Sequence, residues 1–515
     1  MIDTNALRKK VLDLAIRGKL VPQNPNDEPA SVLLERIREE KQRLIREGKI
    51  KKDKVDSIIF RGEDNCHYEK IGNSEPVLLE DLPFEIPANW SWVRFSSLIK
   101  VISGVSYDKH DVCNKGIRIL RGGNINNFNV SLEDDDVFLP ERYYDEEKQV
   151  QINDILIVAS TGSKLAIGKA GYVIAKLENT QIGAFLRIVR PLFEEFAEYI
   201  KTIFATNYYK EHILDSIRGS NINNLKNEHI SNLLIPVPPI EEQLRITKYI
   251  KELFVQIDFI EQNQSDYYSL VESLKKAILQ SAIQGTLVEQ CKDDEPTSEL
   301  LAKIRAEKKA QLGKKYVESY IFKGDDNRYY EHINGKSSDI TEDISFELPS
   351  NWCWARWGDI SESIQYGYNA PAKDEGRIKM VRISDIQNGK VVWERVPYCD
   401  IDEEDINNYM LKAGDILFAR TGGTVGKSYL VTEVPEEAIY AGYLIRTRYS
   451  NQLSSQYLKY FMETNLYWLQ LTNGTTATAQ PNCNGKTLGK MLLPIPPLAE
   501  QERIVSKINE IFAQL

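Results

Sequence analysis

The most regular hydrophobic pattern in the chain runs through residues 240–288. Apolar side chains recur there at alternating steps of four and three residues. This is the a/d seam of a coiled coil and not the broader stripe of a helix on a globular core. Two prolines, Pro238 and Pro239, precede the stretch, and Gly285 marks its end. The pattern predicts one long helix that serves as a spacer, with apolar seam positions at Ile246, Ile250, Leu253, Ile257, Ile260, Val271, Leu274 and Ile278.

The same pattern occurs a second time, divided between the two ends of the chain. Residues 493–504 repeat 235–246, and residues 6–21 repeat 273–288. Burying one Ile or Leu side chain contributes about 1.5–3 kcal/mol, so an exposed seam needs a partner. We therefore expect the two termini to meet and to complete a second helix antiparallel to the first. The alternative is that the chain, which stops at Leu515, is a truncated form. The seam positions of this copy are Leu7, Val11, Leu14, Ile504, Ile508 and Ile511.

The duplication extends along the whole chain. Each half opens with a segment in which two tryptophans alternate, which predicts a buried first strand. Short strands and polar turns follow, and the strand at 154–158 has its copy at 415–419. The strand frames match while many turn residues differ. Because loops carry binding function, we expect two binding domains that recognise two different targets. The tryptophans are Trp90, Trp92, Trp352 and Trp354.

Length and composition limit the class of protein. A chain of 515 residues is too long for one core, and 42% hydrophobic with 27% charged residues is typical of a soluble globular protein. We expect no membrane segment. The six scattered cysteines include no Cys-x-x-Cys pair and favour reduced thiols in a cytoplasmic protein. A net charge of −10 argues against a surface coated in basic charge, so a nucleic-acid surface would be a local patch.

The second half contains a glycine-rich segment, Gly422 to Ser428, that resembles a phosphate-binding loop. Such a loop needs four residues between its first glycine and the Gly-Lys pair, but this segment has three and its copy at 162–169 has five. The spacing therefore favours a β-turn over nucleotide binding. Lys427 and its counterpart Lys169 would then face DNA phosphates, or simply solvent.

Catalytic patterns are missing from the sequence. The nuclease-like Glu146-Glu147-Lys148 lacks a properly placed first carboxylate and has no copy in the second half. The five histidines show no metal-ligand spacing. The sequence contains neither an Asn-Pro-Pro-aromatic methylation motif nor a glycine fingerprint for S-adenosylmethionine. We therefore expect no catalysis, no metal and no cofactor on this chain.

Several loops carry side chains of the types that can bind DNA bases and phosphates. Arginine pairs with guanine, asparagine or glutamine with adenine, small hydroxyls with either, and lysine with phosphates. Asparagine-rich loops also form turns, and that alternative stays open for each residue. The candidates in the first half are Arg121, Asn124, Asn126, Asn127, Lys164, Lys169, Asn221, Asn223, Asn224 and Lys226. Those in the second half are Tyr366, Tyr368, Asn369, Arg382, Arg420, Thr421, Lys427, Gln480, Asn482 and Asn484.

The chain resembles the specificity (S) subunits of Type I restriction–modification systems over essentially its whole length. Their Pro-Pro-x-x-Glu-Gln helix start occurs at 238–243 and again at 496–501. Their Gly-Asp-Ile-Leu strand with a Thr-Gly turn occurs at 414–417 with Thr421-Gly422. A degenerate copy, Asn-Asp-Ile-Leu, occupies 153–156.

The resemblance implies a non-catalytic reader of double-stranded DNA. It implies recruitment of two adenine-N6 methyltransferase (modification) subunits and, through them, of restriction subunits. Each recognition domain would read one half of an asymmetric two-part site, and the helical spacer would set the gap. S-adenosylmethionine, ATP and magnesium are expected only on the partner subunits.

We predict an α+β protein with two strand-rich target-recognition domains, separated by a pair of long antiparallel coiled-coil helices and related by a pseudo-two-fold internal repeat. The charged helices at about 31–48 and 298–312, with the spacer, are expected to dock the methyltransferase subunits. Two alternatives stay open, a self-sufficient endonuclease and a two-headed scaffold that does not bind DNA. The predicted segments are N-terminal helices at 1–48, a recognition domain at 49–236, the central helices at 237–312, a second recognition domain at 313–494 and a C-terminal helix at 495–515.

Overall fold

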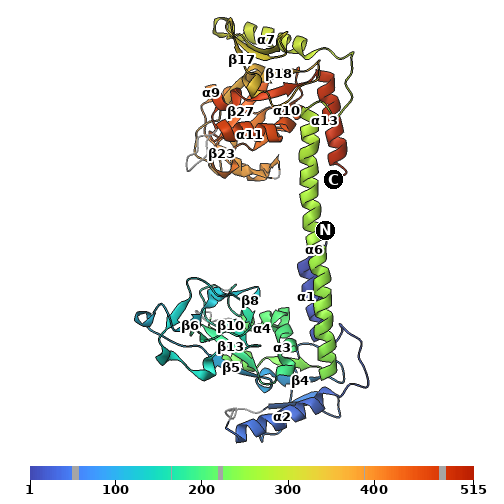
Figure 1. Cartoon of the computed structure of the whole chain (residues 1–515), viewed down its shortest axis with the longest axis vertical. Helices are drawn as coiled ribbons and strands as arrows, with labels where there is room; N and C mark the ends of the chain where they lie inside the picture. Colours follow the sequence, from blue (N-terminus) through green and yellow to red (C-terminus); the bar gives the residue numbers. More distant parts are fainter. Residues whose placement is uncertain (49–56, 164, 218–223, 388, 475–482) are drawn as a thin grey trace. The chain divides into compact units, whose positions relative to one another are not determined.

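The computed structural model describes residues 1–48, 57–163, 165–217, 224–387, 389–474 and 483–515. In these residues the chain forms two compact units, Met1–Ser265 (unit 1) and Asp266–Leu515 (unit 2). Each unit holds a strand-rich domain with helices beside it, as Figure 1 shows. Helix α6 (Ile240–Ile283, 44 residues) contributes to both units, which confirms the long helix predicted from the heptad pattern.

Unit 1 combines helices with four sheets. Its helices, apart from the first part of α6, are α1 (Thr4–Ile16), α2 (Ala30–Arg46), α3 (Ala197–Ala205), α4 (Asn207–Ser216) and α5 (Asn227–Ser231). A small antiparallel sheet holds β1 (Ser57–Arg61), β2 (His67–Ile71) and β3 (Val77–Leu78). The main sheet has the order β5-β13-β10-β11-β8-β7, and two smaller sheets have the orders β12-β6-β9 and β14-β4. Their bounds are β4 (Ser91–Arg94), β5 (Ile99–Ser103), β6 (Ile117–Leu120), β7 (Ile125–Asn126), β8 (Phe128–Val130), β9 (Val137–Leu139), β10 (Ile155–Val158), β11 (Ala170–Tyr172), β12 (Thr180–Ile182), β13 (Leu186–Pro191) and β14 (Leu234–Val237).

Unit 2 repeats this plan. Its helices, besides the second part of α6, are α7 (Thr297–Leu312), α8 (Trp357–Ile360), α9 (Glu403–Tyr409), α10 (Ser455–Phe461), α11 (Asn465–Gly474), α12 (Gly485–Gly489) and α13 (Leu498–Phe512). The sheet orders are β15-β16-β17, β18-β28, β19-β27-β24-β25, β23-β20-β26 and β21-β22. Their bounds are β15 (Ser319–Lys323), β16 (Tyr329–Ile333), β17 (Lys336–Asp339), β18 (Cys353–Arg356), β19 (Ser361–Tyr366), β20 (Ile378–Val381), β21 (Ile386–Gln387), β22 (Lys390–Val391), β23 (Tyr398–Cys399), β24 (Ile416–Ala419), β25 (Ser428–Leu430), β26 (Ala438–Tyr440), β27 (Leu444–Tyr449) and β28 (Leu492–Ile495).

In each unit, the strand that carries the tryptophan signature pairs with the last strand of the strand-rich domain. In unit 1, β4 pairs antiparallel with β14, the proline-containing strand that leads into α6. In unit 2, β18 pairs in the same way with β28, which leads into α13. Trp92 in β4 and Trp354 in β18 are 1% and 2% exposed, so the predicted buried strand is confirmed in both units.

The Glu of the Pro-Pro-x-x-Glu-Gln motif binds the tryptophan that precedes that strand, and the Gln binds the backbone at the start of its own helix. Trp90 Nε1 donates a hydrogen bond to Glu242 Oε2 (3.0 Å), and Gln23 Nε2 donates to Glu242 Oε1 (2.6 Å). Gln243 Nε2 turns back to Pro238 O (2.9 Å). Burial raises the pKa of the Glu242 carboxyl, although these hydrogen bonds act against the shift. Unit 2 has the same arrangement, with Trp352 Nε1 donating to Glu500 Oε2 (2.9 Å).

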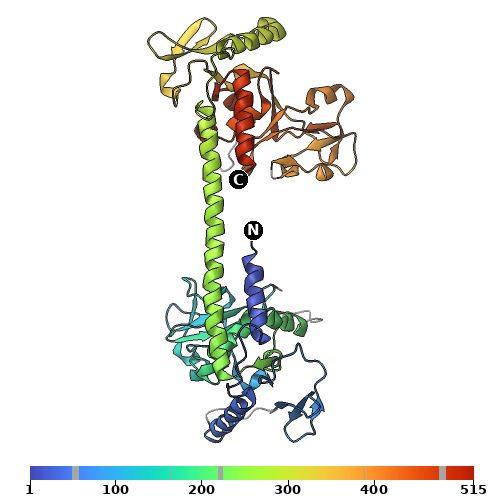
Figure 2. The same ribbon diagram turned by 90° about the vertical axis from the view of Figure 1, so that its right-hand side faces the viewer.

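Figure 2 shows that α1 lies alongside the first part of α6 in unit 1. The two helices are antiparallel. Near the start of α1, Ile2 N donates a hydrogen bond to Gln264 Oε1 (2.8 Å), whereas the end of α1 reaches the start of α6. That contact is a buried cluster of Leu12, Ala15, Trp90, Ile246 and Ile250.

Most seam positions in unit 1 are buried or half-buried. Leu7 is the exception, because its side chain is 37% exposed. The apolar face of α1 that packs on α6 runs through Leu12 and Ala15, so the prediction for Leu7 is corrected. The buried seam residues are Ile246, Ile250 and Ile257, and the half-buried ones are Val11, Leu14, Leu253 and Ile260.

In unit 2, α13 is antiparallel to the second part of α6. Tyr267 Oη donates to Leu515 O (3.3 Å) at one end of this contact. Toward the other end, Ile278, Ile504 and Ile508 share one buried cluster, with Ile511 packed on it. Val271 is 8% exposed, whereas Leu274 is 42% exposed, because the buried face of α6 is centred on Ile278, Leu279 and Ala282. The prediction for Leu274 is therefore corrected.

Both terminal helices thus pair with α6, each within its own unit. The predicted meeting of the two termini concerns the placement of one unit against the other and stays a prediction. The predicted five-segment division of the chain also stays a prediction. Within each unit, α2 and α7 bury one apolar face, formed by Leu33, Leu34 and Ile37 in α2 and by Leu300, Leu301 and Ile304 in α7.

Two features are absent from the described residues. None of their helices has the length and apolar character needed to cross a bilayer. Within the same residues, no three His, Cys, Asp or Glu side chains gather in a group that could hold a metal ion.

Candidate nucleic-acid interface

In unit 2 the predicted residues gather where three strands end. β20 and β26 are parallel, with Val381 opposite Tyr440, so their C-terminal ends lie at one edge of the sheet. The end of β24 joins this edge because Arg420 N donates a hydrogen bond to Tyr443 O (3.2 Å). We call this surface loop edge 2; it comprises residues 366–372, 382–384, 420–424 and 441–443.

Loop edge 2 contains an open cleft of about 810 Å³. Its guanidinium, amide and hydroxyl groups are the types that bind base edges and phosphates. Four predicted residues line it, Tyr368, Asn369, Arg382 and Thr421. Ser384, Thr424 and Tyr443 also line the cleft but are not among the predicted residues.

Arg382 is oriented by a carboxylate beneath it. Its Nε donates to Asp385 Oδ2 (3.0 Å) and its Nη2 donates to Asp385 Oδ1 (2.8 Å), while Asp385 is only 3% exposed. These hydrogen bonds raise the pKa of the Arg382 guanidinium. The pair leaves part of the guanidinium facing the cleft, so Arg382 is a fixed, charged donor at the end of β20.

Arg420 is positioned by an aromatic ring. Its guanidinium carbon lies 4.7 Å from the centroid of the Tyr366 ring, which is a cation–π geometry. Tyr366 Oη in turn accepts a hydrogen bond from Gly485 N (2.9 Å). Two predicted residues are therefore linked: Tyr366 is held by the backbone of Gly485, and its ring positions Arg420. Asn484, also predicted, accepts from Thr487 N (2.9 Å) and caps α12, which gives its side chain a structural role.

The glycine-rich segment of unit 2 joins two antiparallel strands, β24 and β25. A phosphate-binding loop leads from a strand into a helix, so the structure agrees with the turn that the spacing predicts. Lys427 lies at the end of this turn, where its carbonyl accepts from Ala419 N (2.9 Å). Lys169 has the same place in unit 1, with Val158 N as donor (2.9 Å). Both lysine side chains are exposed.

Unit 1 has an equivalent surface, which we call loop edge 1. β6 and β12 are parallel, with Leu120 opposite Ile182, and Arg121 follows β6 as Arg382 follows β20. The end of β10 joins them, because Ala159 N donates to Phe185 O (2.8 Å). Loop edge 1 comprises residues 121–127, 159–163, 183–185 and 224–226.

Arg121 is a half-buried cation at the end of β6. Its Nη2 donates to Asp135 Oδ2 (3.0 Å). Asn126 and Asn127 are exposed in the turn between β7 and β8, and Asn127 has φ 46°, a turn conformation that asparagine tolerates. Asn224 is exposed beside Ser160, and Lys226 is exposed before α5.

Asn124 is a correction to the predicted set. It is 2% exposed, and its Oδ1 accepts from Arg121 N (2.7 Å). Its Nδ2 donates to Ser131 O (3.0 Å) and Asp136 Oδ1 (2.6 Å). All these partners lie inside the domain, so the side chain cannot reach a base. The predicted residues Lys164, Asn221, Asn223, Gln480 and Asn482 lie outside the described residues.

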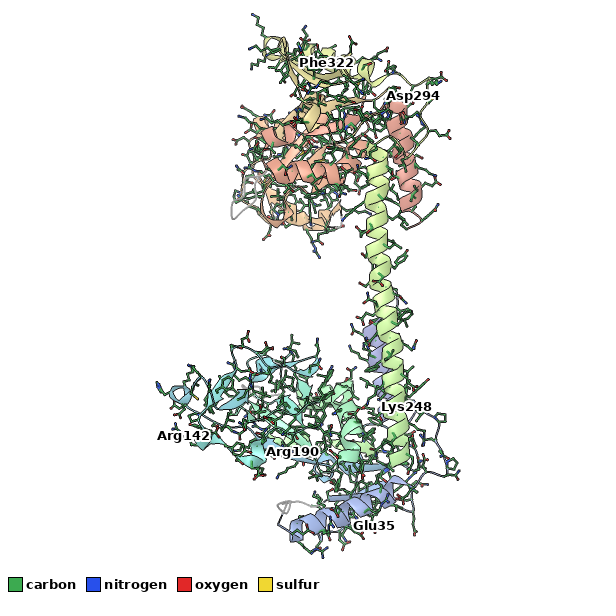
Figure 3. All side chains as sticks on the ribbon, in the orientation of Figure 1. Glu35, Arg142, Arg190, Lys248, Asp294 and Phe322 are labelled. Atoms are coloured by element: carbon green, nitrogen blue, oxygen red, sulfur yellow. The ribbon has the colours of Figure 1, made fainter. Side chains whose placement is uncertain are left out.

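In both units, the Asp of the Asp-Ile-Leu strand forms a paired hydrogen bond with an arginine of a neighbouring strand. Arg190 Nε donates to Asp154 Oδ1 (2.8 Å) and Arg190 Nη2 to Oδ2 (2.7 Å). Arg448 holds Asp415 in the same two-pronged way. Asp154 is fully buried, and that burial raises the pKa of its carboxyl. Figure 3 shows Arg190 inside the recognition domain of unit 1, whereas Arg142 lies farther from α6.

The nuclease-like Glu146–Lys148 forms a short 3₁₀ turn. Within it, Glu147 pairs with Lys100 (2.6 Å), and Lys148 pairs with Asp145 (3.1 Å). These are surface ion pairs within unit 1. The arrangement gives no support to the endonuclease alternative.

Comparison with known proteins gives one consistent family. The model of the Type I restriction modification DNA specificity domain matches residues 87–266 and again 349–515, together more than half of the chain. The EcoAI specificity subunit of Escherichia coli is 26% identical, with 98% of this chain and 88% of that protein covered. The EcoKI specificity subunit of Escherichia coli K12 is 25% identical, with 83% of each chain covered.

The structural comparison agrees on the fold. A chain from a structure concerned with complex assembly and conformational transition of the type I restriction–modification system has a TM-score of 0.53 and 16% identity. The match covers 84% of this chain and 92% of that chain. The α+β fold, with two recognition domains joined by a long helix, is the one predicted. The chain therefore belongs to the family of Type I restriction–modification specificity subunits, the components that recognise DNA sequence in such complexes.

Proposed function

We propose that this chain is a non-catalytic reader of an asymmetric, two-part DNA site, with loop edge 1 reading one half and loop edge 2 the other. The observation that carries the proposal is a shared backbone frame with different side chains. Ala159 N donates to Phe185 O in unit 1, and Arg420 N donates to Tyr443 O in unit 2. Arg420 therefore stands where unit 1 has Ala159. Two surfaces built alike but carrying different donors would select different bases.

The partners in this proposal are double-stranded DNA, two adenine-N6 methyltransferase subunits and, through them, restriction subunits. S-adenosylmethionine, ATP and magnesium would bind on those partners. The net charge of −10 fits a chain that contacts DNA through two local edges within a larger assembly.

We propose α2 and α7, together with α6, as the docking surface for the methyltransferase subunits. Each charged helix is anchored to its own recognition domain by a lysine. Lys41 Nζ donates to Ser96 O (3.1 Å), and Lys308 Nζ donates to Gly358 O (2.7 Å). Burial lowers the pKa of the Lys308 ammonium. The opposite faces are exposed and charged, as in Glu35, which Figure 3 labels on α2.

Domain exchange tests the reading role. Residues 84–235 are replaced by the corresponding domain of a relative, and methylated adenines are mapped in a host carrying the complete operon. One half of the methylated sequence should change while the other half stays. An unchanged motif would refute the proposal. Behaviour that is insensitive to salt, with no retention on DNA, would favour the scaffold alternative. Metal-dependent cleavage by the purified chain alone would favour the endonuclease alternative.

Gel filtration tests the docking role separately. Full-length chain and the cognate modification subunit should co-elute as one complex. Separate elution of the two proteins would contradict the docking proposal but would not contradict the DNA-reading proposal.

A further inference from the structure

One large side chain projects from the same position of both loop edges. Phe185 is 69% exposed in unit 1, and Tyr443 is 67% exposed in unit 2. Single exposed apolar residues are common on protein surfaces. Here the exposure is repeated at equivalent positions of the two loop edges, which also carry Arg121 and Arg382 at equivalent positions. A ring that is exposed on both loop edges, among groups that could bind base edges, fits a ligand with a flat face on which the ring can stack.

Each ring is held in place by its backbone. In unit 1, Leu186 N donates to Gly183 O (2.9 Å), which closes a β-turn with Phe185 at its third position. In unit 2, Leu444 N donates to Ala441 O (2.9 Å) and places Tyr443 in the same way. Gly183 N and Ala441 N also donate to the ends of β6 and β20 (2.9 Å in both). The chain is therefore fixed before and after each ring.

The carbonyls of the two aromatic residues provide a third anchor. Phe185 O accepts from Ala159 N (2.8 Å) and Ser160 N (3.1 Å), and Tyr443 O accepts from Arg420 N (3.2 Å). With the backbone fixed, only two side-chain torsions remain free. Ordering such a ring on a ligand therefore has a small entropic cost.

The surroundings of Tyr443 indicate the chemistry of the ligand. The ring lines the cleft of loop edge 2 together with Asn369, Arg382 and Thr421. Hydrogen-bonding groups around a flat apolar face match a nucleobase, which has polar edges and a π-face. The equivalent ring in unit 1 is a phenylalanine, so a hydroxyl is not needed for the shared role.

We propose that Phe185 and Tyr443 are base-stacking residues, each of which packs on a base or wedges at a base step of the half-site read by its own unit. The inference rests on the proposed DNA-reading function and adds to it a contact that carries no charge. Apolar side chains that insert at base steps unstack and bend DNA, and rings that stack on bases add affinity with little dependence on sequence.

The test uses the full-length chain in complex with its modification subunits. The DNA is a duplex carrying the site mapped by methylation. We expect Phe185→Ala and Tyr443→Ala each to weaken binding about 5- to 150-fold, the range for loss of one stacked base. The slope of log K against log salt should stay as in the wild type, because no phosphate contact is removed. Tyr443→Phe and Phe185→Tyr should bind as the wild type does.

A fluorescent base assigns each ring to a half-site. 2-Aminopurine is placed in turn at non-target positions of each half of the duplex. Tyr443→Ala should change the emission only in the half read by unit 2, and Phe185→Ala only in the other half. Phe60→Ala, which removes a 41% exposed ring on the small sheet of unit 1, is the matched control and should leave emission and affinity unchanged.

The outcomes separate the inference from the function on which it rests. Wild-type complex that binds scrambled duplex as tightly as the site would overturn the DNA-reading proposal itself. Sequence-specific wild-type binding with alanine variants of unchanged affinity would overturn the stacking role alone. Alanine variants that lose the modification subunits on gel filtration would also overturn it, because the rings would then be protein contacts.

Discussion

Replacing Arg420 by alanine tests whether the difference between the two loop edges is a difference in base reading. The substitution gives unit 2 the side chain that unit 1 has at Ala159, on the same backbone frame. Arg420 lies over the ring of Tyr366 (4.7 Å) and belongs to loop edge 2. We expect Arg420→Ala to weaken recognition of the half-site read by unit 2 and to leave the other half-site unaffected.

The size of the effect follows from the contact that Arg420 would make. A bidentate arginine–guanine pair contributes about 1–3 kcal/mol of discrimination, which is about 5- to 150-fold in affinity. Loss of a partly exposed cation–π contact costs about 0.5–1 kcal/mol of stability. In a unit of this size, that corresponds to a Tm decrease of about 1–4 °C. The binding defect should therefore appear in a protein that remains folded.

Fluorescence anisotropy with the assembled modification complex measures the effect. Three duplexes are compared, the intact site and two versions in which one half is scrambled. The penalty of Arg420→Ala should persist when the unit 1 half is scrambled and vanish when the unit 2 half is scrambled. Arg377→Ala removes the same charge at the opposite end of β20, where Arg377 pairs with Glu403 (2.6 Å), and should have little effect. An equal loss on all three duplexes would mean that Arg420 contacts phosphate, and the base-reading role would be refuted.

Four further predictions concern stability, its pH dependence and the salt dependence of DNA binding. Glu242→Ala should lower the free energy of unfolding by about 1–3 kcal/mol in denaturant titrations, because Trp90 Nε1 loses its buried acceptor. Because burial raises the folded pKa of Glu242, its stabilisation is complete below the unfolded pKa and falls as pH rises through the folded pKa. The stability of the wild type relative to Glu242→Gln should therefore decline over that window; a constant or rising difference would contradict the sign. Asp154→Ala should destabilise unit 1 by about 3–5 kcal/mol in thermal or denaturant unfolding, because Arg190 is left without its carboxylate, and a loss below 1 kcal/mol would contradict it. Lys427→Ala should reduce the magnitude of the log K against log salt slope by about 1 without changing the preferred sequence, whereas an unchanged slope would exclude a phosphate contact.

The repeat and the spacer were predictable because both follow from local periodicity. A seam with steps of four and three residues predicts a helix whatever surrounds it, and α6 is that helix. The buried tryptophan strands were predictable for a similar reason, since alternating tryptophans indicate one buried face. Leu7 and Leu274 are more exposed than their seam positions predict, because the buried faces of α1 and α6 follow partners that periodicity alone does not specify.

The candidate site was harder to predict because it depends on contacts distant in sequence. Asn124 looks like a loop residue available to DNA, yet Asp136 and the backbone of Arg121 use its amide. Phe185 and Tyr443 sit beside strand residues, where aromatic side chains usually indicate core. Their rings are exposed because each lies in a turn, and backbone hydrogen bonds to the ends of neighbouring strands hold that turn in place. The local signal of these rings is a small-small-aromatic turn before a strand, Gly183-Ala184-Phe185 in one half and Ala441-Gly442-Tyr443 in the other.

The duplication separates what holds each unit together from what it reads. The buried contacts are the same in both copies: a tryptophan on a carboxylate, an arginine on the Asp of the Asp-Ile-Leu strand, and an amide or carboxylate under the first arginine of the loop edge. Differences also lie on the exposed edges, such as Phe185 against Tyr443, which are 69% and 67% exposed. Exposed substitutions usually change stability by less than about 0.5 kcal/mol, whereas loss of a buried partner costs several times more. Sequence changes at a loop edge can therefore alter the recognised bases while the fold keeps its stability, which is the physical basis for two different readers on one repeated scaffold.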